Sequence, residues 1–568
     1  MVRGGPISLA EYMQDCLTSP AGGFYMSRDV FGSAGDFVTS PEISQMFGEM
    51  VGIWCVHTWM EMGRPPRLQL VELGPGRGTL MADLLRGTSA FRDFSRALEV
   101  HLVEMSPALR AMQWRALRCE PAPAPEVRLP AGPGAAPAAA GGAAAAAATA
   151  AGKAARAAAV AAQSEEADLQ YLRSGMPPLV GQQQQQQQQQ TLHHQQKRQQ
   201  QEQPQPVERQ LGPSAAGVGE SGSAGAPQAP STPAVGVSGF NGCRVHWHAT
   251  LDAVPDGPSP ALYVAHEFFD ALPVHQFVRD PERGWLEKMV DVEHPEEEEG
   301  HEGGVGKASD VGAGGMTAAA AAAVRDGGQG AGGAGATALP GAAVRGSGSA
   351  GRGAGAAGAG PAHSTSGSGL RLVLSPGPTP AAALLVPRRL AGLAKEQAEG
   401  VNELEVSAVG MATAERLAQR IGRHGGAALV VDYGREAPPY GDSLMAIRAH
   451  RGVGVLDRPG TADLSAWVDF GALRQAAAGA GGPVSCSGPA TQAAFLLSLG
   501  LEARLGQLVA AAQAADGGSG GGGGGANAVA SALVEGARRL VDTGEGGMGR
   551  SYQVMAIHHS SLRQLAGL

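Results

Sequence analysis

The sequence predicts an α/β protein built on a parallel sheet and interrupted by long insertions. Short apolar runs, typical of buried strands, alternate with segments of helical character. A glycine-rich turn, "VELGPGRGTL", joins the first of these runs to a helix. Low-complexity tracts separate the alternating segments without adding to their pattern. These three observations favour one large α/β core over a string of separate domains.

Helical signals open the chain. Ser8 is followed three residues later by Glu11, which is the spacing of a capping box. After a turn-rich segment, a longer helix is predicted from Ser40, as its N-cap, to Gly63 at its end. We therefore expect residues 1–64 to form an N-terminal helical region.

The strands and helices of the predicted sheet follow in order. A buried strand over residues 68–73 precedes a helix over 79–86, and a strand over 100–104 precedes a helix capped by Ser106. Later strands are predicted in "CRVHWHAT", "ALYVAHEFFDALPV" and "AALVVDYG", the last after a helix over about 412–423. Ligands of such sheets bind beyond the carboxyl ends of the strands.

Composition sets the expected domain boundaries. The chain holds 86 Gly, and only 4% of its 568 residues are aromatic, so part of it buries too little apolar surface to offset chain entropy. We expect disordered, low-complexity insertions there. The expected divisions are the helical region 1–64, core segments 65–120, 241–292 and 370–568, and insertions 121–240 and 293–369. The last core segment contains a substrate-side lobe at about 435–475 and a Gly-rich loop at 512–526.

Charge and cysteine usage exclude several classes of function. The formal net charge is −9 and no basic stripe is present, so nucleic acid is not an expected partner. Five scattered cysteines without a CxxC pair indicate a reduced compartment and no zinc site. His246 and His248 share a strand face, but two histidines do not make a metal site. No membrane span is expected, and the oligomeric state is not predicted.

The N-terminal residues show neither a signal peptide nor a full transit peptide. Either none exists or the recorded start lies downstream of the true one.

The spacing of the glycine turn separates the candidate ligands. Dinucleotide-binding folds need G-x-G-x-x-G, but Gly76 is followed three residues later by Thr79. Phosphate-binding loops need Lys after the last glycine, and none follows. The pattern that remains is E-x-G-x-G-x-G, which begins at Glu72. A purely structural strand–helix turn stays open as the alternative reading.

This pattern resembles the first motif of class I S-adenosylmethionine-dependent methyltransferases. In that family the glycines let the backbone approach the amino-acid part of the cofactor, and a carboxylate ending the next strand accepts hydrogen bonds from the ribose hydroxyls. Glu104 stands at that second position. The resemblance therefore implies a site for S-adenosyl-L-methionine formed by Glu72, Gly74, Gly76, Arg77, Gly78, Thr79 and Glu104.

A wider resemblance covers nearly all of the non-repetitive chain. The phrases "GDFVTSPEISQMFGE", "VELGPGRGTLMADLLR", "AHEFFDALPVHQF", "LVVDYG" and "PGTADLSAWVDF" occur here in one order. Together they are similar to the MidA family, a mitochondrial complex I assembly factor also described as a protein arginine methyltransferase. The resemblance implies a Rossmann-like methyltransferase sheet with N-terminal helical additions, and a mitochondrial matrix protein. It further implies symmetric dimethylation of an arginine in a matrix-side complex I subunit during assembly.

Arginine methylation requires carboxylates that face a fixed cation. A guanidinium is permanently charged, so an enzyme must hold it by planar carboxylate contacts and direct one nitrogen toward the methyl group. Glu267 and Asp270 in "HEFFDALP" follow a predicted strand, and we expect them to be the catalytic residues. Alternatively, either carboxylate caps the next turn or pairs with an arginine. Asp432 and Tyr433 end a strand near the same edge, where a structural role stands beside a role in the site.

The phrase "GDFVTSPEIS" runs into a helix start, where exposed backbone N–H groups favour an anionic group such as a carboxylate. Gly35, Asp36, Thr39 and Ser40 are therefore expected to close over the cofactor. An ordinary helix N-cap is the alternative.

Two functions of other classes stay open. The chain could be a non-catalytic complex I assembly scaffold that retains the methyltransferase fold, or a methyltransferase for a small molecule. Residues 441–470 are long for a plain α/β connection, and suit either a lobe that docks a protein or a lid over a small substrate.

Overall fold

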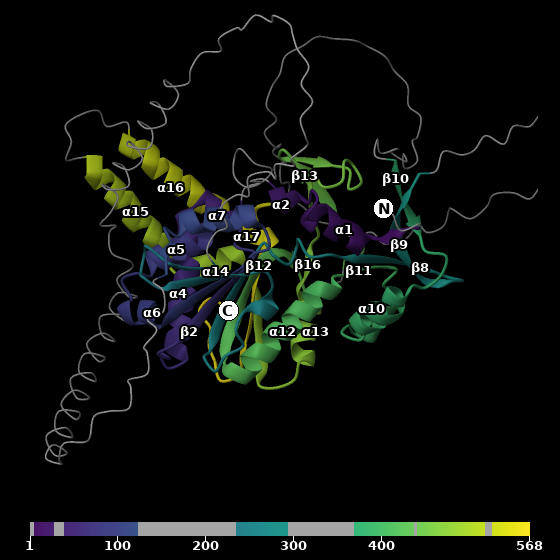
Figure 1. Ribbon diagram of the computed structural model, residues 1–568, viewed down its shortest axis with the longest axis horizontal. Coiled ribbons are helices and arrows are strands. Elements are labelled where there is room, and N and C mark those ends of the chain that lie inside the picture. Colours follow the sequence, from purple (N-terminus) through teal and green to yellow (C-terminus); the bar gives the residue numbers. More distant parts are fainter. Residues whose placement is uncertain (1–4, 28–38, 123–233, 294–368, 437–439, 517–524) are drawn as a thin grey trace, which may run out of the picture. The chain divides into compact units, whose positions relative to one another are not determined.

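A computed structural model describes residues 5–27, 39–122, 234–293, 369–436, 440–516 and 525–568. Its largest sheet runs in the order β17-β18-β12-β7-β2-β3-β6-β5-β4, with β16 (Val468–Asp469) paired to β12 (Figure 1). The parallel strands are β2 (Leu68–Leu73), β3 (Leu98–Val103), β6 (Arg244–His248), β7 (Ala261–His266) and β12 (Gly426–Arg435). These are the five strands that the sequence predicts, so the α/β fold class is confirmed.

Antiparallel strands complete both sides of this sheet. On one side β18 (Tyr552–His559) pairs with β12 and with β17 (Val484–Thr491). On the other side β5 (Val235–Val237) and β4 (Glu120–Pro121) follow β6, so described strands extend into the range expected as the first insertion. Strand β2 lies between β3 and β7, so the order in which strands are added to the sheet reverses at β2. Open α/β sheets bind ligands at such a point.

Helices cover both faces of the sheet, so its central strands are buried throughout. Every residue of β2 and β7 is buried. One face packs against α4 (Gln45–Glu61), α5 (Thr79–Gly87) and α6 (Arg92–Ala97). The other packs against α12 (Ala408–His424) and α13 (Phe470–Gly479). At the edge, α7 (Pro107–Ala116) begins after its cap Ser106, as predicted.

The N-terminal helices follow the predicted caps in part. The Ser8–Glu11 capping box is present at the start of α1 (Leu9–Thr18), and α2 (Phe24–Ser27) comes next. The single predicted helix from Ser40 is wrong, because α3 (Ser40–Ile43) has Thr39 as its N-cap and ends before α4. Ser44 is extended, with φ −157° and ψ 132°, and its hydroxyl accepts a hydrogen bond from the Met46 N–H.

Two smaller sheets flank the α/β core. One contains β1 (Ile7–Ser8), β8 (His275–Asp280), β9 (Gly284–Val292), β10 (Leu370–Leu374) and β11 (Glu403–Val406), with α10 (Pro380–Leu390) and α11 (Lys395–Glu399) nearby. The other contains β13 (Met445–Arg448), β14 (Arg451–Val453) and β15 (Asp463–Ser465). We call residues 440–465 the lobe; it shares an apolar core with α1, α2 and β9.

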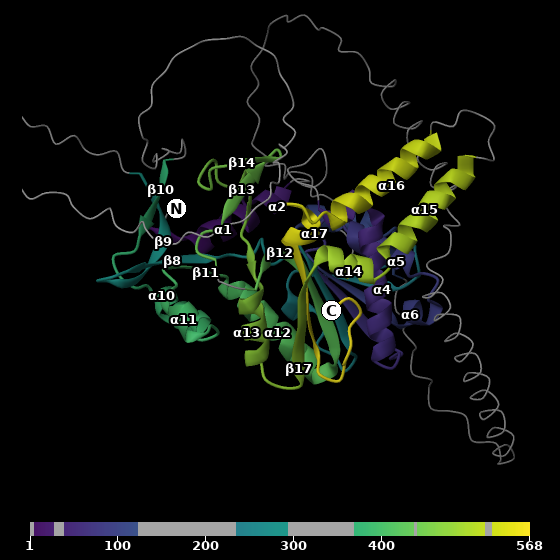
Figure 2. The same cartoon turned by 180° about the vertical axis from the view of Figure 1, so that it is seen from behind.

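The C-terminal helices are α14 (Gln492–Ser498), α15 (Leu501–Asp516), α16 (Gly525–Val541) and α17 (Met548–Ser551). Figure 2 shows α15 and α16 side by side. A buried ion pair between Arg504 and Glu49, 2.7 Å apart, joins α15 to α4. In the described part of the chain no single helix passes as a membrane span, and only α14 and α15 together, bent by 66°, have the length and composition.

Candidate active site

A cavity of about 520 Å³ opens at the carboxyl ends of β2, β3 and β7. It is the location that the fold predicts for a ligand. Its walls come from the glycine turn after β2, the loop after β7, α2, α3 and the lobe. The cavity therefore joins the two groups of residues that the sequence assigns to the cofactor and to the acceptor.

The glycine turn adopts backbone angles that favour glycine at all three positions. Gly74, Gly76 and Gly78 have φ values of 64°, 53° and 84°. A Cβ at Gly74 would lie 2.9 Å from a ring carbon of Phe268, so the missing side chain lets this ring pack on the turn. Gly74 and Gly76 line the cavity together with Arg77 and Thr79, whereas Gly78 is the N-cap of α5 and does not line it.

Glu72 lines this cavity, and its carboxylate is buried. The residue is 3% exposed, and its Oε2 atom has no hydrogen-bond partner among the described residues. Burial raises the pKa of the Glu72 carboxyl to about 8. A cationic group in the cavity would supply the missing partner and favour the ionised carboxylate.

Glu104 lies one residue beyond β3 and also lines the cavity. Its Oε1 accepts the Ser106 N–H at 2.8 Å, and its Oε2 accepts the Gln113 side-chain amide at 3.3 Å. Burial raises the pKa of Glu104 to about 7, although these hydrogen bonds act against the rise. A carboxylate oxygen accepts more than one donor, so ligand hydroxyls can still be accommodated.

Gln113 on α7 connects the turn to Glu104, a role that no local pattern indicates. Its Nε2 donates to the Gly76 carbonyl at 2.7 Å as well as to Glu104. Its Oε1 accepts the indole N–H of Trp247 at 2.9 Å, and because that indole is only a donor, the orientation of the amide is fixed. An amide in a helix carries no recognisable signal in sequence, since its partners lie on three other elements.

Glu267, directly after β7, adopts left-handed backbone angles with a φ of 48°. Its Oε1 accepts the Tyr552 hydroxyl at 3.0 Å, and the Ser40 N–H also donates to the carboxylate. Burial, followed by the negative charge of Asp270, raises the pKa of Glu267 to about 8. Burial lowers the pKa of the neighbouring His266 to about 3, so the neutral imidazole at 3.5 Å provides no compensating charge.

Asp270 lies on the same loop, and its Oδ1 has no hydrogen-bond partner among the described residues. Burial raises the pKa of Asp270 to about 6, while a hydrogen bond with Tyr433 lowers it. The loop itself is held by Asp432 of β12, whose Oδ2 accepts the backbone N–H groups of Phe268, Phe269 and Asp270 at 3.2, 3.0 and 3.3 Å. Of the two roles left open for Asp432, the structure shows the structural one.

The residues expected to close over the cofactor are only partly described. Gly35 and Asp36 lie outside the described residues. Thr39 lines the cavity, but Ser40 is fully buried and its N–H is directed at Glu267. At the rim, Arg77 pairs with Glu42 at 3.1 Å.

Two further residues of the cavity wall, Tyr25 and Asp463, carry no recognisable signal in the sequence. The Tyr25 hydroxyl of α2 donates to Asp463 Oδ1 of β15 at 2.6 Å, across 438 residues of sequence. Both line the cavity beside Glu267 and Asp270. Among the lining residues that the structure describes, the carboxylates are Glu42, Glu72, Glu104, Glu267, Asp270 and Asp463, and Arg77 is the sole arginine or lysine. The cavity therefore suits a ligand or substrate with positive charge.

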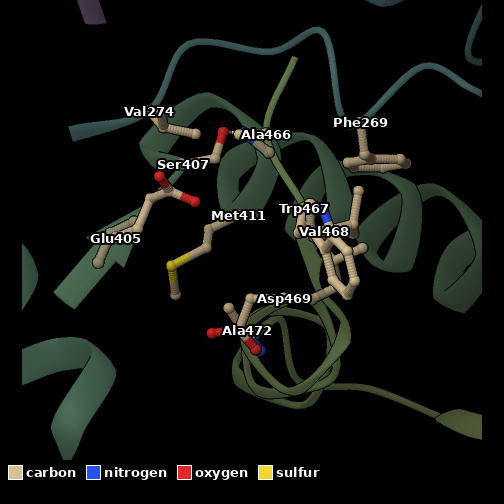
Figure 3. A pocket seen from close by; sticks show the side chains of 13 residues that line it. Phe269, Val274, Glu405, Ser407, Met411, Ala466, Trp467, Val468, Asp469 and Ala472 are labelled. Carbon is tan, nitrogen blue, oxygen red and sulfur yellow. Dashed lines mark hydrogen bonds between the residues drawn. The ribbon is translucent and has the colours of Figure 1, made fainter. Parts of the chain in front are cut away.

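Other features offer no competing site. A cavity of about 30 Å³, lined by Glu405, Met411 and Trp467 among others, has room for little more than a water molecule (Figure 3). His101 stacks with His246 and contacts His248, yet no group of three or more ligand-type side chains in the described part could hold a metal ion. All five cysteines fall within described segments and are unpaired.

Comparison with known proteins identifies the family. A family model described as "S-adenosyl-L-methionine-dependent methyltransferase" matches residues 50–135 and 180–490. The mitochondrial protein arginine methyltransferase NDUFAF7 of Mus musculus is 30% identical over 89% of this chain and 73% of its own length. The homologous mitochondrial NDUFAF7 protein of Drosophila melanogaster is 31% identical over 89% of this chain and 74% of its own length. These names agree with the expected mitochondrial localisation.

A solved structure shares the fold. It is a crystal structure of a Burkholderia thailandensis protein bound to S-adenosyl-homocysteine. The alignment has a TM-score of 0.51 and 18% identity, and covers 99% of this chain and 90% of that one.

Proposed function

This chain belongs to the S-adenosyl-L-methionine-dependent methyltransferase family, and from that premise we propose that it methylates an arginine side chain of a mitochondrial protein. The membership confirms the resemblance to the MidA family and the expected cofactor, S-adenosyl-L-methionine. The acceptor and the residues that act on it belong to the proposal.

One observation carries the proposal. A single cavity is lined by two groups: the glycine turn with Glu72 and Glu104, which we call the cofactor end, and the buried carboxylates Glu267 and Asp270, which we call the acceptor end. Methyl transfer needs donor and acceptor side by side, with the accepting nitrogen in line with the methyl group. The acidic end suits a cationic acceptor, and a guanidinium offers the planar set of donors that carboxylates bind best.

The cofactor end supplies hydrogen-bond acceptors and open backbone that suit S-adenosyl-L-methionine. When bound, S-adenosyl-L-methionine supplies a methyl group activated by a positively charged sulfur. The unpartnered oxygen of Glu72 would accept from its ammonium group, and Glu104 would accept from its ribose hydroxyls. The backbone at Gly74 and Gly76 leaves open the close approach that a side chain would block. Gln113 would fix Glu104 against the turn.

At the acceptor end, Glu267 and Asp270 act on the guanidinium. Burial raises the pKa of both carboxyls and so disfavours two negative charges there, and a bound guanidinium would favour the ionised forms. Glu267, held by Tyr552 and the Ser40 N–H, would orient one nitrogen toward the methyl group. That nitrogen loses a proton as it gains the methyl group, and an ionised carboxylate beside it can accept this proton.

We further propose the finer assignments that the MidA resemblance implies. The substrate is a matrix-side subunit of respiratory complex I, modified during assembly, and the product is symmetric dimethylarginine. Support comes from the names of the relatives, which are mitochondrial protein arginine methyltransferases, and from the acidic character of the acceptor end. A protein substrate also suits the lobe, because it provides a surface beside the cavity.

The test is methyl transfer from radiolabelled S-adenosyl-L-methionine to whole mitochondrial extract, with hydrolysis of the labelled protein and identification of the methylated amino acid. We expect symmetric dimethylarginine in one protein. Gly76→Val is the matched control, because valine disfavours a φ of 53° and would obstruct the turn, so cofactor binding and labelling should both be lost.

Other outcomes separate the alternatives. Label in a small molecule instead of protein would identify a metabolite methyltransferase. Cofactor binding by calorimetry without any transfer would favour the assembly scaffold. Unchanged cofactor affinity in Gly76→Val would contradict the assignment of the glycine turn.

A further inference from the structure

The cavity wall beside Glu267 and Asp270 carries a third carboxylate from a distant part of the chain. Asp463 begins β15 of the lobe and is 7% exposed. The Tyr25 hydroxyl holds its Oδ1 at 2.6 Å. Tyr25 comes from α2, so two elements outside the methyltransferase sheet meet at the acceptor end of the cavity.

Backbone contacts fix this wall against the loop after β7. The Ala466 N–H, directly after β15, donates to the Asp270 carbonyl at 2.9 Å. Burial and the charges of Asp463, Asp270 and Glu267 raise the pKa of Tyr25, so the phenol stays protonated among three carboxyl groups. Electrostatic repulsion between Asp463 and Glu267 also contributes to the raised pKa of Glu267. All three carboxylates therefore act on the same small volume.

The arrangement matches a guanidinium better than an ammonium. A guanidinium is flat and has five N–H donors that point outward along several edges, whereas an ammonium has three donors around a point charge. Asp463 comes from β15, whereas Glu267 and Asp270 follow β7, so carboxylates from two different elements line the acceptor end. Carboxylates from separate elements can engage more than one edge of a flat cation, and an ammonium has no such edges.

We propose that Asp463, positioned by Tyr25, is a second anchor for the acceptor guanidinium and makes the site prefer arginine to lysine. The proposal rests on the proposed function and adds a specificity residue to it. The lobe then has a defined chemical task, since it adds to the acceptor site a carboxylate that the sheet and its loops do not supply.

The test uses the full chain with the variants Asp463→Asn and Tyr25→Phe, assayed with labelled cofactor on mitochondrial extract. Loss of a charge-assisted contact should raise the half-saturating concentration of acceptor protein on the order of tenfold for Asp463→Asn, and less for Tyr25→Phe. Cofactor affinity should not change. The ratio of methylarginine to methyllysine in the hydrolysate should fall. Asp442→Asn, an exposed lobe carboxylate, is the matched control and should behave as the unmodified protein.

The outcomes distinguish this inference from the proposed function. If the unmodified protein produces no methylarginine, the proposed function fails. If it does, and both variants keep its half-saturation and product ratio, the role of Asp463 alone is overturned. Loss of cofactor affinity in Asp463→Asn would overturn it too. A melting curve for each variant detects misfolding, and Tyr25→Phe still decides the question if Asp463→Asn does not fold.

Discussion

Glu267 occupies a backbone conformation that costs free energy, and this cost indicates that its side chain has a function in the site. A non-glycine residue at a φ of 48° loses on the order of 1 kcal/mol or more relative to ordinary angles. Its carboxylate is also buried beside Asp270. Two unfavourable features at one residue are expected where position in a site matters more than stability.

Replacing Glu267 by Gln should lower the rate of methyl transfer by on the order of a hundredfold or more. The amide keeps the shape but loses the charge that orients the guanidinium and accepts its proton. Cofactor affinity and melting temperature should be preserved. Single-turnover methylation, cofactor titration and a melting curve on the variant measure the three quantities.

The same three measurements can also contradict a catalytic role for Glu267. A loss of cofactor binding would assign Glu267 to the cofactor site, and earlier melting alone would make its carboxylate a structural cap. Glu282→Gln, on an exposed turn, is the control for the same chemical change.

The ionisation of the buried carboxyls predicts the pH dependence of stability. Burial raises the pKa of both Glu72 and Glu267 to about 8 in the folded protein, from an ordinary value of 4.5. The folded state then holds protons that the unfolded state has released, so stability declines as pH rises from about 4.5 through about 8. The melting temperature of the ligand-free protein, measured from pH 6.5 to 9, should fall.

The decline should be smaller in Glu72→Gln and Glu267→Gln, because neither amide titrates. A starting pH of 6.5 limits the opposite contribution of buried histidines, whose pKa values lie below the ordinary one. If the melting temperatures of variant and unmodified protein differ by a constant amount from pH 6.5 to 9, the raised pKa values are contradicted.

The predictable residues of the site are those close together in sequence. Glu72, Gly74 and Gly76 lie on one strand and turn, so their spacing alone indicates a shared site. Tyr25 and Asp463 are 438 residues apart, and neither carries a local pattern. Only the folded chain brings them together, so their pairing could not be read from sequence.

Between elements, the decisive contact joins β12 to the loop after β7. The two strands are parallel neighbours, which brings Asp432 near the end of β12 beside the residues that follow His266. One oxygen of Asp432 accepts three consecutive backbone N–H groups. The sequence places both strand ends at one edge of the sheet, but it does not reveal which carboxylate holds the backbone and which faces the cavity.

Asp432→Ala should therefore destabilise the fold and slow methyl transfer together. Three buried N–H groups would lose their acceptor, at a cost of at least about 2 kcal/mol. Urea unfolding should show the loss, while Asp432→Asn, which keeps one acceptor oxygen, should lose less. Cofactor affinity should change little, because the glycine turn belongs to β2. Unfolding of Asp432→Ala at the same urea concentration as the unmodified protein would rule out this role.

Across the whole molecule, local patterns were enough for the main sheet and insufficient for its additions. Four of the five parallel strands, β2, β3, β7 and β12, are short and mainly apolar runs, so their order and type could be predicted. The sheet of β1, β8, β9, β10 and β11 joins residues from 7 to 406, and the lobe packs against α1. Pairings at such separations depend on the folded chain and leave no periodic signal.

Strand pairs hold together the chain ends on either side of the two long low-complexity segments. Glu120 and Pro121 pair with Val237 and Gly236, and Leu370 pairs with Val292. Short turns can therefore replace residues 125–231 and 296–366 without separating any described strands. The first deletion must stop before β5, because Gly236 packs closely against Trp114 and Cys119.

A chain shortened in this way should keep its melting temperature and its affinity for S-adenosyl-L-methionine almost unchanged. The removed segments have compositions that bury little apolar surface, and shorter loops cost slightly less entropy to close. A second deletion, of 125–240, removes β5 as well and serves as the contrast, because β6 then keeps β3 but loses its antiparallel partner and should leave a less stable sheet edge. If the shorter deletions already lower the melting temperature by many degrees, the removed residues contribute to the fold. If they lower only methyl transfer to mitochondrial protein, those residues help to recruit the substrate, and the core alone performs the chemistry.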